Sequence, residues 1–243
     1  MSAELRRLIR EMSVANRLWG APRIQAELAK LGVEVALSTV QKYMVRRPAT
    51  RPETGPSWRV FLRNHLRRTV AVDFMTVATA NFRVIHVFVV LSLSRRKILH
   101  VNVTGHPTAA WTAQQVVEAF PWGDVPDYLQ RDRDGIYGEL FKQQVKALGI
   151  EELISAPRSP WQNGYVERVI GTIRRECLDH MIVFGENHLR EVLKEYVSYY
   201  NTSRTHLSLD GDCPEHREPQ TEGRVYAVPW LGGLHHTYRR KVG

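Results

Sequence analysis

The sequence predicts an α/β protein in which a mixed β-sheet is covered by helices, preceded by a small all-α segment. Two observations support this class. Near Thr69 the apolar residues change from helical spacing to β-rich runs. Three consecutive strand-like runs are then followed by helical and strand-like segments in alternation. A meander followed by such an alternation is typical of a mixed sheet with helices packed against it.

The all-α segment predicts three short helices. Apolar residues have helical spacing over 2–16 and 21–32, and Ser38 and Thr39 are expected to cap a third helix that ends in two arginines. Two helices, a turn and a third helix form a helix-turn-helix pattern. A small helical bundle with a solvated basic face would have the same pattern, so the pattern alone does not establish DNA binding.

The distribution of charge favours a nucleic-acid partner for this first region. The chain has a formal net charge of +9 and a pI of about 9.8. Residues 1–70 carry 14 Lys and Arg against 5 Asp and Glu, whereas residues 71–243 carry 20 of each. The basic excess therefore lies wholly in the N-terminal part, as expected of a DNA-binding segment joined to a neutral domain.

Proline and glycine cluster between the two regions, at Pro48, Pro52, Gly55 and Pro56, which predicts a linker. The expected organisation is a helix-turn-helix DNA-binding domain over 1–47, a linker over 48–66, a larger α/β domain over 67–205 and a C-terminal extension over 206–243.

The larger domain consists of short elements. The runs over 69–77 and 82–93 predict a hairpin, and 97–103 predicts a third strand. Further strands are expected over 127–131 and 150–155, and helices over 107–120, 137–149, 161–181 and 188–202.

Several functional classes are disfavoured. Cys177 and Cys213 have neither disulfide-framework nor zinc-site spacing and are expected to be reduced thiols. The longest apolar run, 84–93, contains a histidine and is too short to span a bilayer. The first residues lack the apolar core of a signal peptide. A soluble, cytoplasmic protein without membrane contact is expected.

Three acidic residues are candidates for a shared site. Asp73 lies within an apolar strand, where an unpaired carboxylate is costly without a counter-charge or a metal. Asp132 follows a short strand, at the end where open α/β sheets place ligand-binding residues. Glu167 lies near the start of a helix soon after the last strand. Taken singly, the aspartate could pair with an arginine and the glutamate could be a solvated surface residue. Together the three could form an all-oxygen site for Mg²⁺ or Mn²⁺.

Three motifs around these acids carry a family resemblance. The stretches "AVDF", "RDRDGIYGELF" and "SPWQNGYVER" resemble the three motifs of the integrase catalytic core in DDE transposases of bacterial insertion sequences, relatives of retroviral integrases. The stretch "YYNTSRTHLSL" is similar to the segment that follows the catalytic helix in those transposases. The helix-turn-helix region also resembles theirs, so the resemblance runs from about Leu18 to Leu209.

This resemblance implies a ribonuclease H-like fold, with a five-stranded mixed sheet flanked by helices. It implies a polynucleotidyl transferase that cleaves a phosphodiester at the element's end with water and then joins the freed 3′-hydroxyl to target DNA. Two ions of Mg²⁺ or Mn²⁺ per active site are implied. Asp73 would bridge both ions, Asp132 would hold one and Glu167 the other.

The second acid has a rival. The family places an aromatic residue five positions after this acid, and Asp132 has that spacing to Tyr137. Asp134 directly precedes Gly135 and is the alternative. Between the second and third acids lie 34 residues if Asp132 is chosen and 32 if Asp134 is chosen, and the former is closer to the usual family spacing.

DNA contacts are expected from two regions. Gln162 and Asn163 could contact a sugar or base edge, and the arginines of the third-motif helix could contact phosphates, unless they pair with Glu176 or Asp179. Trp161 could stack on a base or anchor the loop from beneath. The expected DNA-binding residues are Arg23, Ser38, Thr39, Gln41, Lys42, Arg46 and Arg47 in the first domain, and Gln162, Asn163, Arg168, Arg174 and Arg175 near the third acid.

The remaining features are less specific. His86, His100 and His106 are interpreted as core or edge residues, and the basic tail 235–243 as a DNA contact or a frayed terminus. The implied partners are double-stranded DNA at element ends and target, a homo-oligomer on paired ends, and an upstream or accessory DNA-binding protein. Two rival functions stay open: a helix-turn-helix regulator with an inactive integrase-like domain, and a nuclease of the same fold without strand transfer.

Overall fold

The computed structural model describes residues 2–15, 20–45, 58–121, 124–157 and 159–241. The chain divides into two compact units, Met1–Gly55 and Pro56–Gly243. Within the described ranges, no helix combines the length and apolar character needed to cross a membrane.

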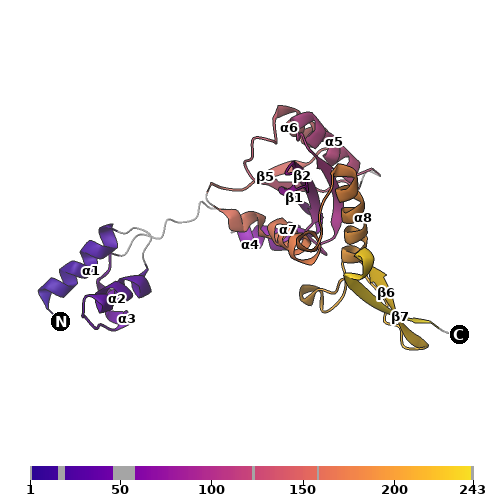
Figure 1. Ribbon diagram of the computed structural model, residues 1–243. Coiled ribbons are helices and arrows are strands. Elements are labelled where there is room, and N and C mark those ends of the chain that lie inside the picture. Colours follow the sequence, from indigo (N-terminus) through magenta and orange to yellow (C-terminus); the bar gives the residue numbers. More distant parts are fainter. Residues whose placement is uncertain (1, 16–19, 46–57, 122–123, 158, 242–243) are drawn as a thin grey trace. The chain divides into compact units, whose positions relative to one another are not determined.

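The first unit contains helices α1 (Ala3–Ala15), α2 (Ala21–Lys30) and α3 (Leu37–Tyr43), as predicted (Figure 1). Its core is apolar and is made by one side chain or more from each helix. Gly32 follows α2 with a φ of 75°, a left-handed conformation that glycine adopts without strain. The buried core residues are Ile9, Ala21, Ile24, Leu28 and Val40.

The predicted cap of the third helix is wrong. Ala36 occupies the N-cap position of α3 and makes no side-chain cap hydrogen bond, while Ser38 and Thr39 lie inside the first turn. Helix α3 starts earlier than expected because Leu37, whose side chain is exposed, already has helical geometry. Arg46 and Arg47 lie outside the described residues.

The larger unit is built on a mixed five-stranded sheet with the order β3-β2-β1-β4-β5. The strands β1, β2 and β3 pair antiparallel, and β1, β4 and β5 pair parallel, which confirms the predicted meander and mixed sheet. Their bounds are β1 Thr69–Ala78, β2 Val84–Ser92, β3 Ile98–Thr104, β4 Tyr128–Arg131 and β5 Glu151–Ile154.

Helices cover both faces of this sheet (Figure 1). Alternate residues of β1 point to opposite faces. Val70 and Val72 join the core beneath α5 (Ala109–Ala119) and α6 (Glu139–Ala147). Ala71 and Met75 join the core beneath α7 (Gly164–Glu176) and α8 (Glu186–Thr202). The central strand is thus buried between two helical layers, as the predicted fold class requires.

One further helix lies inside the range predicted as linker. Helix α4 (Trp58–His65) precedes a 3₁₀ turn, η1 (Leu66–Arg68). The ring of Phe61 packs edge-on against Tyr128 of β4, with ring centroids 5.1 Å apart. The predicted linker therefore extends too far, because the aromatic stripe of α4 has a place to pack beside the sheet.

The predicted helix over 161–181 is interrupted. It comprises a 3₁₀ turn η2 (Pro160–Asn163), the helix α7, and a second turn η3 (Leu178–His180). Cys177 breaks the helix with φ −136° and ψ −67°. Its side chain is fully buried, and burial first, then the charge of Glu195, raises the pKa of this thiol to about 12.

The C-terminal region is ordered rather than frayed. A short turn η4 (Leu207–Leu209) is followed by β6 (Arg224–Trp230), a turn η5 (Leu231–Gly233) and β7 (His235–Lys241). β6 and β7 pair antiparallel as a two-stranded hairpin that projects from the end of α8 (Figure 1). Residues 235–241 of the tail therefore form a strand, and the interpretation of this part as a frayed terminus is wrong.

Candidate active site

The candidate site lies where β1 runs on beyond its parallel partner. β4 pairs with β1 only over Thr69–Ala71, whereas β2 pairs with β1 as far as Ala78. The carbonyl oxygen of Val72 accepts a hydrogen bond from Asn163 Nδ2 at 3.5 Å, and that of Thr76 accepts one from Arg174 Nη2 at 2.9 Å. Side chains from η2 and α7 thus satisfy carbonyls at a strand edge that would otherwise lack partners.

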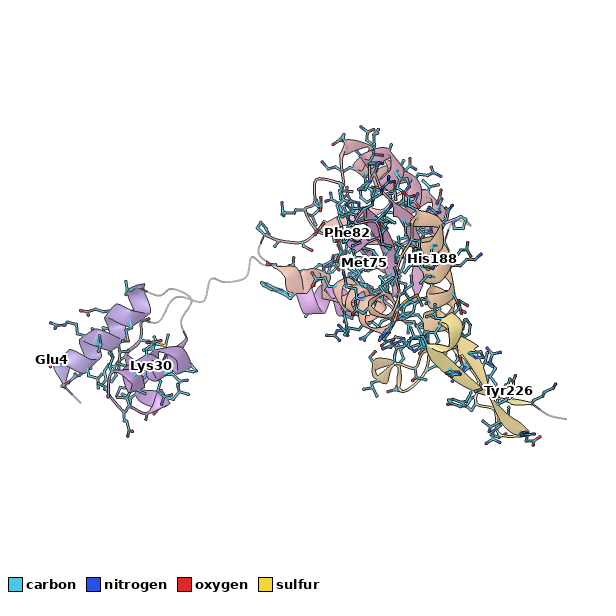
Figure 2. The ribbon with its side chains drawn as sticks, viewed as in Figure 1. Glu4, Lys30, Met75, Phe82, His188 and Tyr226 are labelled. Carbon is cyan, nitrogen blue, oxygen red and sulfur yellow. The ribbon has the colours of Figure 1, made fainter. Side chains whose placement is uncertain are left out.

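Asp73 lies between these two anchored carbonyls. The alternation of β1 places it on the same face as Ala71 and Met75, toward α7, and Met75 lies in the interior of the larger unit (Figure 2). Glu167 lies in the first turn of α7 with its side chain exposed. Asp73, Asp134 and Glu167 line one cleft of about 380 Å³. Two of the three predicted acids therefore share this cleft with the rival second acid.

The segment after β4 brings two aspartates to this edge. Asp132 is half-buried, and its Oδ1 accepts a hydrogen bond from the backbone N–H of Asp134 at 3.1 Å. Asp134 is exposed, and its Oδ1 accepts one from Ile136 N at 3.0 Å. Both carboxylates therefore shape the turn, and both raise the pKa of Asp73 through their charges, Asp132 more than Asp134.

The electrostatics of the cleft are unfavourable to a fully ionised set of acids. Burial raises the pKa of Asp73 to about 7, opposed by a hydrogen bond from Phe74 N at 2.8 Å and reinforced by the charges of Asp132, Glu167 and Asp134. Burial first, then the charges of Asp73 and Asp132, raises the pKa of Tyr137 well above its usual value. Within the described residues its hydroxyl has no hydrogen-bond partner.

This donor set suits a hard divalent cation. Carboxylate oxygens are the ligands that Mg²⁺ and Mn²⁺ prefer, and a bound cation would offset the cost of ionising Asp73, whose pKa is raised by burial first and then by the neighbouring carboxylates. No group of three or more His, Cys, Asp or Glu side chains in the described ranges is already arranged as a metal cluster. Asp73, Asp134 and Glu167 therefore fit such an ion by chemistry and by their common cleft, whereas Asp132 is not among the residues that line it.

The two amides expected to contact DNA have partners inside the protein. Asn163 is 3% exposed and its Nδ2 donates to Val72 O, so this position favours an internal role, and its contact with DNA stays a prediction. Gln162 accepts two hydrogen bonds that hold the loop. Its backbone carbonyl accepts one from Gln130 Nε2, and its side-chain Oε1 accepts one from Ala156 N at 2.6 Å. These amides fix the start of α7.

Trp161 differs from the expectation that it anchors the loop from beneath. Its side chain is 69% exposed, directly before the helix that carries Glu167. An anchoring role is therefore wrong, and the other predicted role, stacking on a base, stays open.

The arginines of α7 are exposed. In the described part of the chain, none of Arg168, Arg174 and Arg175 forms an ion pair with Glu176 or Asp179, so that alternative is wrong. Arg174 lines the cleft and uses one nitrogen to hold Thr76 O.

The sequence interpretation missed one cleft residue. His86 lies opposite Thr76 in the β1–β2 register and lines the cleft with Arg174. Its buried Nδ1 has no hydrogen-bond partner in the described residues. By contrast, His100 Nε2 contacts Gln115 Oε1 at 2.9 Å, as expected of an edge residue. The register of a tight hairpin centred near 79–83 was the signal that could have placed His86 beside the cleft.

In the first unit, α3 presents the polar residues predicted to contact DNA. Ser38, Gln41 and Lys42 are exposed, and Thr39 is half-buried. The side chain of Arg23 is outside what the structure describes, although its backbone lies in α2.

Comparisons with known proteins agree with this fold. A family model described as "Integrase core domain" matches residues 148–214. "Insertion element IS476 uncharacterized 39.2 kDa protein" of Xanthomonas euvesicatoria is 26% identical over 197 residues, covering 80% of this chain and 57% of that protein. "Putative transposase InsK for insertion sequence element IS150" of Escherichia coli (strain K12) is 24% identical over 240 residues, covering 90% of this chain and 84% of that protein. This chain thus spans little more than half the length of the first relative.

A solved structure gives the class of fold. A chain in the cryo-EM structure of the simian T-cell lymphotropic virus intasome, in complex with PP2A regulatory subunit B56 gamma, superposes with a TM-score of 0.52 and 14% identity, covering 96% of this chain and 86% of that chain. The larger unit thus has the ribonuclease H-like fold of integrase cores. The family-model match and the insertion-sequence relatives make this chain similar to the integrase core domain and to insertion-sequence transposases.

Proposed function

We propose that this chain transposes DNA, by metal-dependent cleavage at insertion-sequence ends and transfer of the freed 3′-hydroxyl into target DNA. The observation that carries the proposal is the convergence of Asp73, Glu167 and the aspartates after β4 at the open edge of β1. Phosphoryl transfer without a covalent enzyme intermediate requires such an acidic centre rather than a nucleophilic side chain.

Asp73, Asp132 and Glu167 would hold two ions of Mg²⁺ or Mn²⁺. Ions bound there would supply electrostatic stabilisation of the attacking and leaving oxygens in phosphoryl transfer. The chain itself supplies positioning. Phe74 N–H holds one carboxylate oxygen of Asp73, and Asn163 and Arg174 hold α7 against β1, which sets the position of Glu167.

The DNA would be held by basic side chains in and beside this cleft and by the first unit. The exposed arginines Arg168, Arg174 and Arg175 would contact phosphates near the cleft. The residues of α3 would recognise the element ends, and a homo-oligomer would pair two ends.

The test is joining of a labelled element-end duplex to a plasmid in the presence of Mg²⁺. Wild type should join, and Asp73→Asn, Asp132→Asn and Glu167→Gln should lose joining by at least about 1,000-fold. Asp134→Asn decides between the two aspartates, because it should retain joining if Asp132 is the second acid. Glu151→Gln, which removes an exposed acid on β5, is the matched control.

Two outcomes would favour the rival functions. Cleavage without joining by wild type would indicate a nuclease of the same fold. DNA binding with neither cleavage nor joining, at any divalent ion concentration, would indicate a regulator.

A further inference from the structure

The hairpin β6–β7 has one unusual face. Alternate residues of a strand share a face, and in this register Arg224 lies opposite Lys241 and Tyr226 lies opposite Arg239. These four residues, here called the ribbon face, lie together on the half of the hairpin that is far from its turn. Three cations and a tyrosine thus occupy two adjacent cross-strand pairs.

The ribbon face is exposed and lacks acidic partners. All four side chains are exposed, and Tyr226 lies near the outer part of the hairpin (Figure 2). None of the three cations forms an ion pair with an acid in the described part of the chain. Arg240, on the opposite face, differs because its Nη1 donates to Gly223 O at 2.9 Å.

This arrangement is unfavourable without an anion. Like charges directly opposite each other across a strand pair are destabilising, and a two-stranded hairpin is only marginally stable by itself. A basic composition of the larger unit does not explain this cluster of cations, because residues 71–243 carry equal numbers of basic and acidic side chains. The concentration of positive charge is therefore local to this face.

The base of the hairpin is firmly attached. The His235 ring stacks on Tyr199 of α8, with centroids 4.6 Å apart and an interplanar angle of 2°. The backbone N–H of Leu231, whose side chain is buried, donates to Glu195 Oε1 at 2.5 Å. The ribbon face is therefore presented on a fixed support.

We propose that the ribbon face binds the sugar–phosphate backbone of duplex DNA, at a surface separate from both the acidic cleft and helix α3. This inference rests on the proposed function for the identity of the polyanion. Arg224, Arg239 and Lys241 contact phosphates, and Tyr226 packs against a sugar. A two-stranded β-ribbon is narrow enough to follow a groove of the duplex. Backbone contacts carry no sequence information, so this surface holds any duplex equally.

The experiment measures binding of the full chain to a duplex of arbitrary sequence, without divalent ions, over a range of salt concentrations. Arg224→Gln with Arg239→Gln should weaken binding roughly 10- to 30-fold at physiological salt and lower the slope of log K against log salt by about 2. The matched control, Lys146→Gln with Lys194→Gln, removes two exposed cations from α6 and α8 and should change neither value.

Thermal unfolding of both double variants should match wild type, which separates lost contacts from lost structure. An unchanged DNA affinity and salt slope in the Arg224→Gln, Arg239→Gln variant would overturn the proposal. So would a variant that loses binding to anionic phospholipid vesicles but binds DNA as wild type does. The two proposals fail in different assays. The proposed function is tested by joining, whereas the ribbon face is tested by duplex binding, which requires no phosphoryl transfer. Binding to duplex should persist in Glu167→Gln.

Discussion

Arg204 and Glu176 form a two-pronged ion pair, with Nη2 2.6 Å from Oε1 and Nε 2.7 Å from Oε2. Glu176 is the last residue of α7, and Arg204 follows α8. The pair therefore joins the end of the helix that carries Glu167 to the end of the neighbouring helix. His235 Nε2 contacts the backbone oxygen of Glu176 at 2.7 Å, so the C-terminal hairpin meets α7 at the same point.

Removal of Arg204 should destabilise the protein. Arg204→Ala leaves Glu176 half-buried without its partner, and we expect a loss of about 1–3 kcal/mol in the free energy of unfolding at pH 7. The measurement is denaturant unfolding followed by circular dichroism. Lys142→Ala, which breaks an exposed pair with Glu139, is the control and should cost less than about 0.5 kcal/mol.

The same pair predicts a pH dependence. Burial alone would raise the pKa of Glu176, but the hydrogen bond and charge of Arg204, together with a hydrogen bond from Tyr196, hold this pKa below its usual value. A carboxyl with a lowered folded pKa stabilises the protein above its unfolded pKa of about 4.3 and loses that contribution as pH falls further. Unfolding free energy of wild type should therefore fall below this pH, and Glu176→Gln should show a shallower fall. Equal slopes in both proteins would contradict the prediction.

The contribution of Asp73 to stability should depend on pH in the opposite direction. Because its folded pKa is raised to about 7, the folded state binds its proton more tightly than the unfolded state does. The stabilisation is complete below the unfolded pKa of about 3.9 and is lost as pH rises through about 7. Asp73→Asn should therefore be more stable than wild type at pH 8, by roughly 1–3 kcal/mol, while losing activity.

Divalent ions provide the second measurement on Asp73. Millimolar Mg²⁺ or Mn²⁺ should raise the melting temperature of wild type, because an ion that binds only the folded state stabilises it. The same addition should leave the melting temperature of Asp73→Asn unchanged. A variant that is stabilised by Mg²⁺ as much as wild type would argue against Asp73 as a metal ligand.

Asn163 should act as a positioning residue. Asn163→Ala removes the buried amide that reaches Val72 O, and we expect a loss of about 1–2 kcal/mol in stability. Joining should slow at saturating DNA, while DNA affinity stays close to wild type. A weakened affinity with an unchanged maximal rate would instead support a direct DNA contact, as the sequence suggested. Arg168→Ala, which removes an exposed cation on the following helix α7, should show that contrasting pattern.

His86 should contribute to joining through the cleft that it lines with Arg174. Loss of one hydrogen bond to a charged phosphate costs about 1.5–3 kcal/mol, so His86→Ala should reduce joining roughly 10- to 100-fold. The measurement is the joining rate at limiting DNA. His106→Ala removes an exposed imidazole outside this cleft and should join at the wild-type rate. Equal rates for the two variants would place His86 among structural residues.

Local sequence patterns were sufficient to predict most of the helices and strands. Strand β1 was predictable because its β-branched residues are bounded by turn residues, and the position of Asp73 within an apolar strand marked it as costly. The place of Glu167 near the start of a helix followed from the Pro- and Gly-containing loop before it. These inferences use only neighbouring residues, which is why they succeeded.

Other elements depended on distant partners. Helix α4 is stabilised by Tyr128, which is far along the chain, and the end of α7 at Cys177 is fixed by a fully buried thiol. The hairpin β6–β7 lacks a regular alternation of buried and exposed residues, because most of its side chains are exposed on both faces. A pattern of burial therefore could not reveal it.

The sequence by itself determined the fold class and the mixed sheet, because periodicity and local chemistry specify these. Only the tertiary structure decided which polar side chains remain available. Asn163 and Gln162 are used by backbone groups at the edge of β1 and in the loop before α7, Trp161 is exposed, and His86 reaches the cleft. The physical reason is that a hydrogen-bonding group is available to DNA only when no buried partner within the protein claims it, and those partners come from distant segments of the chain.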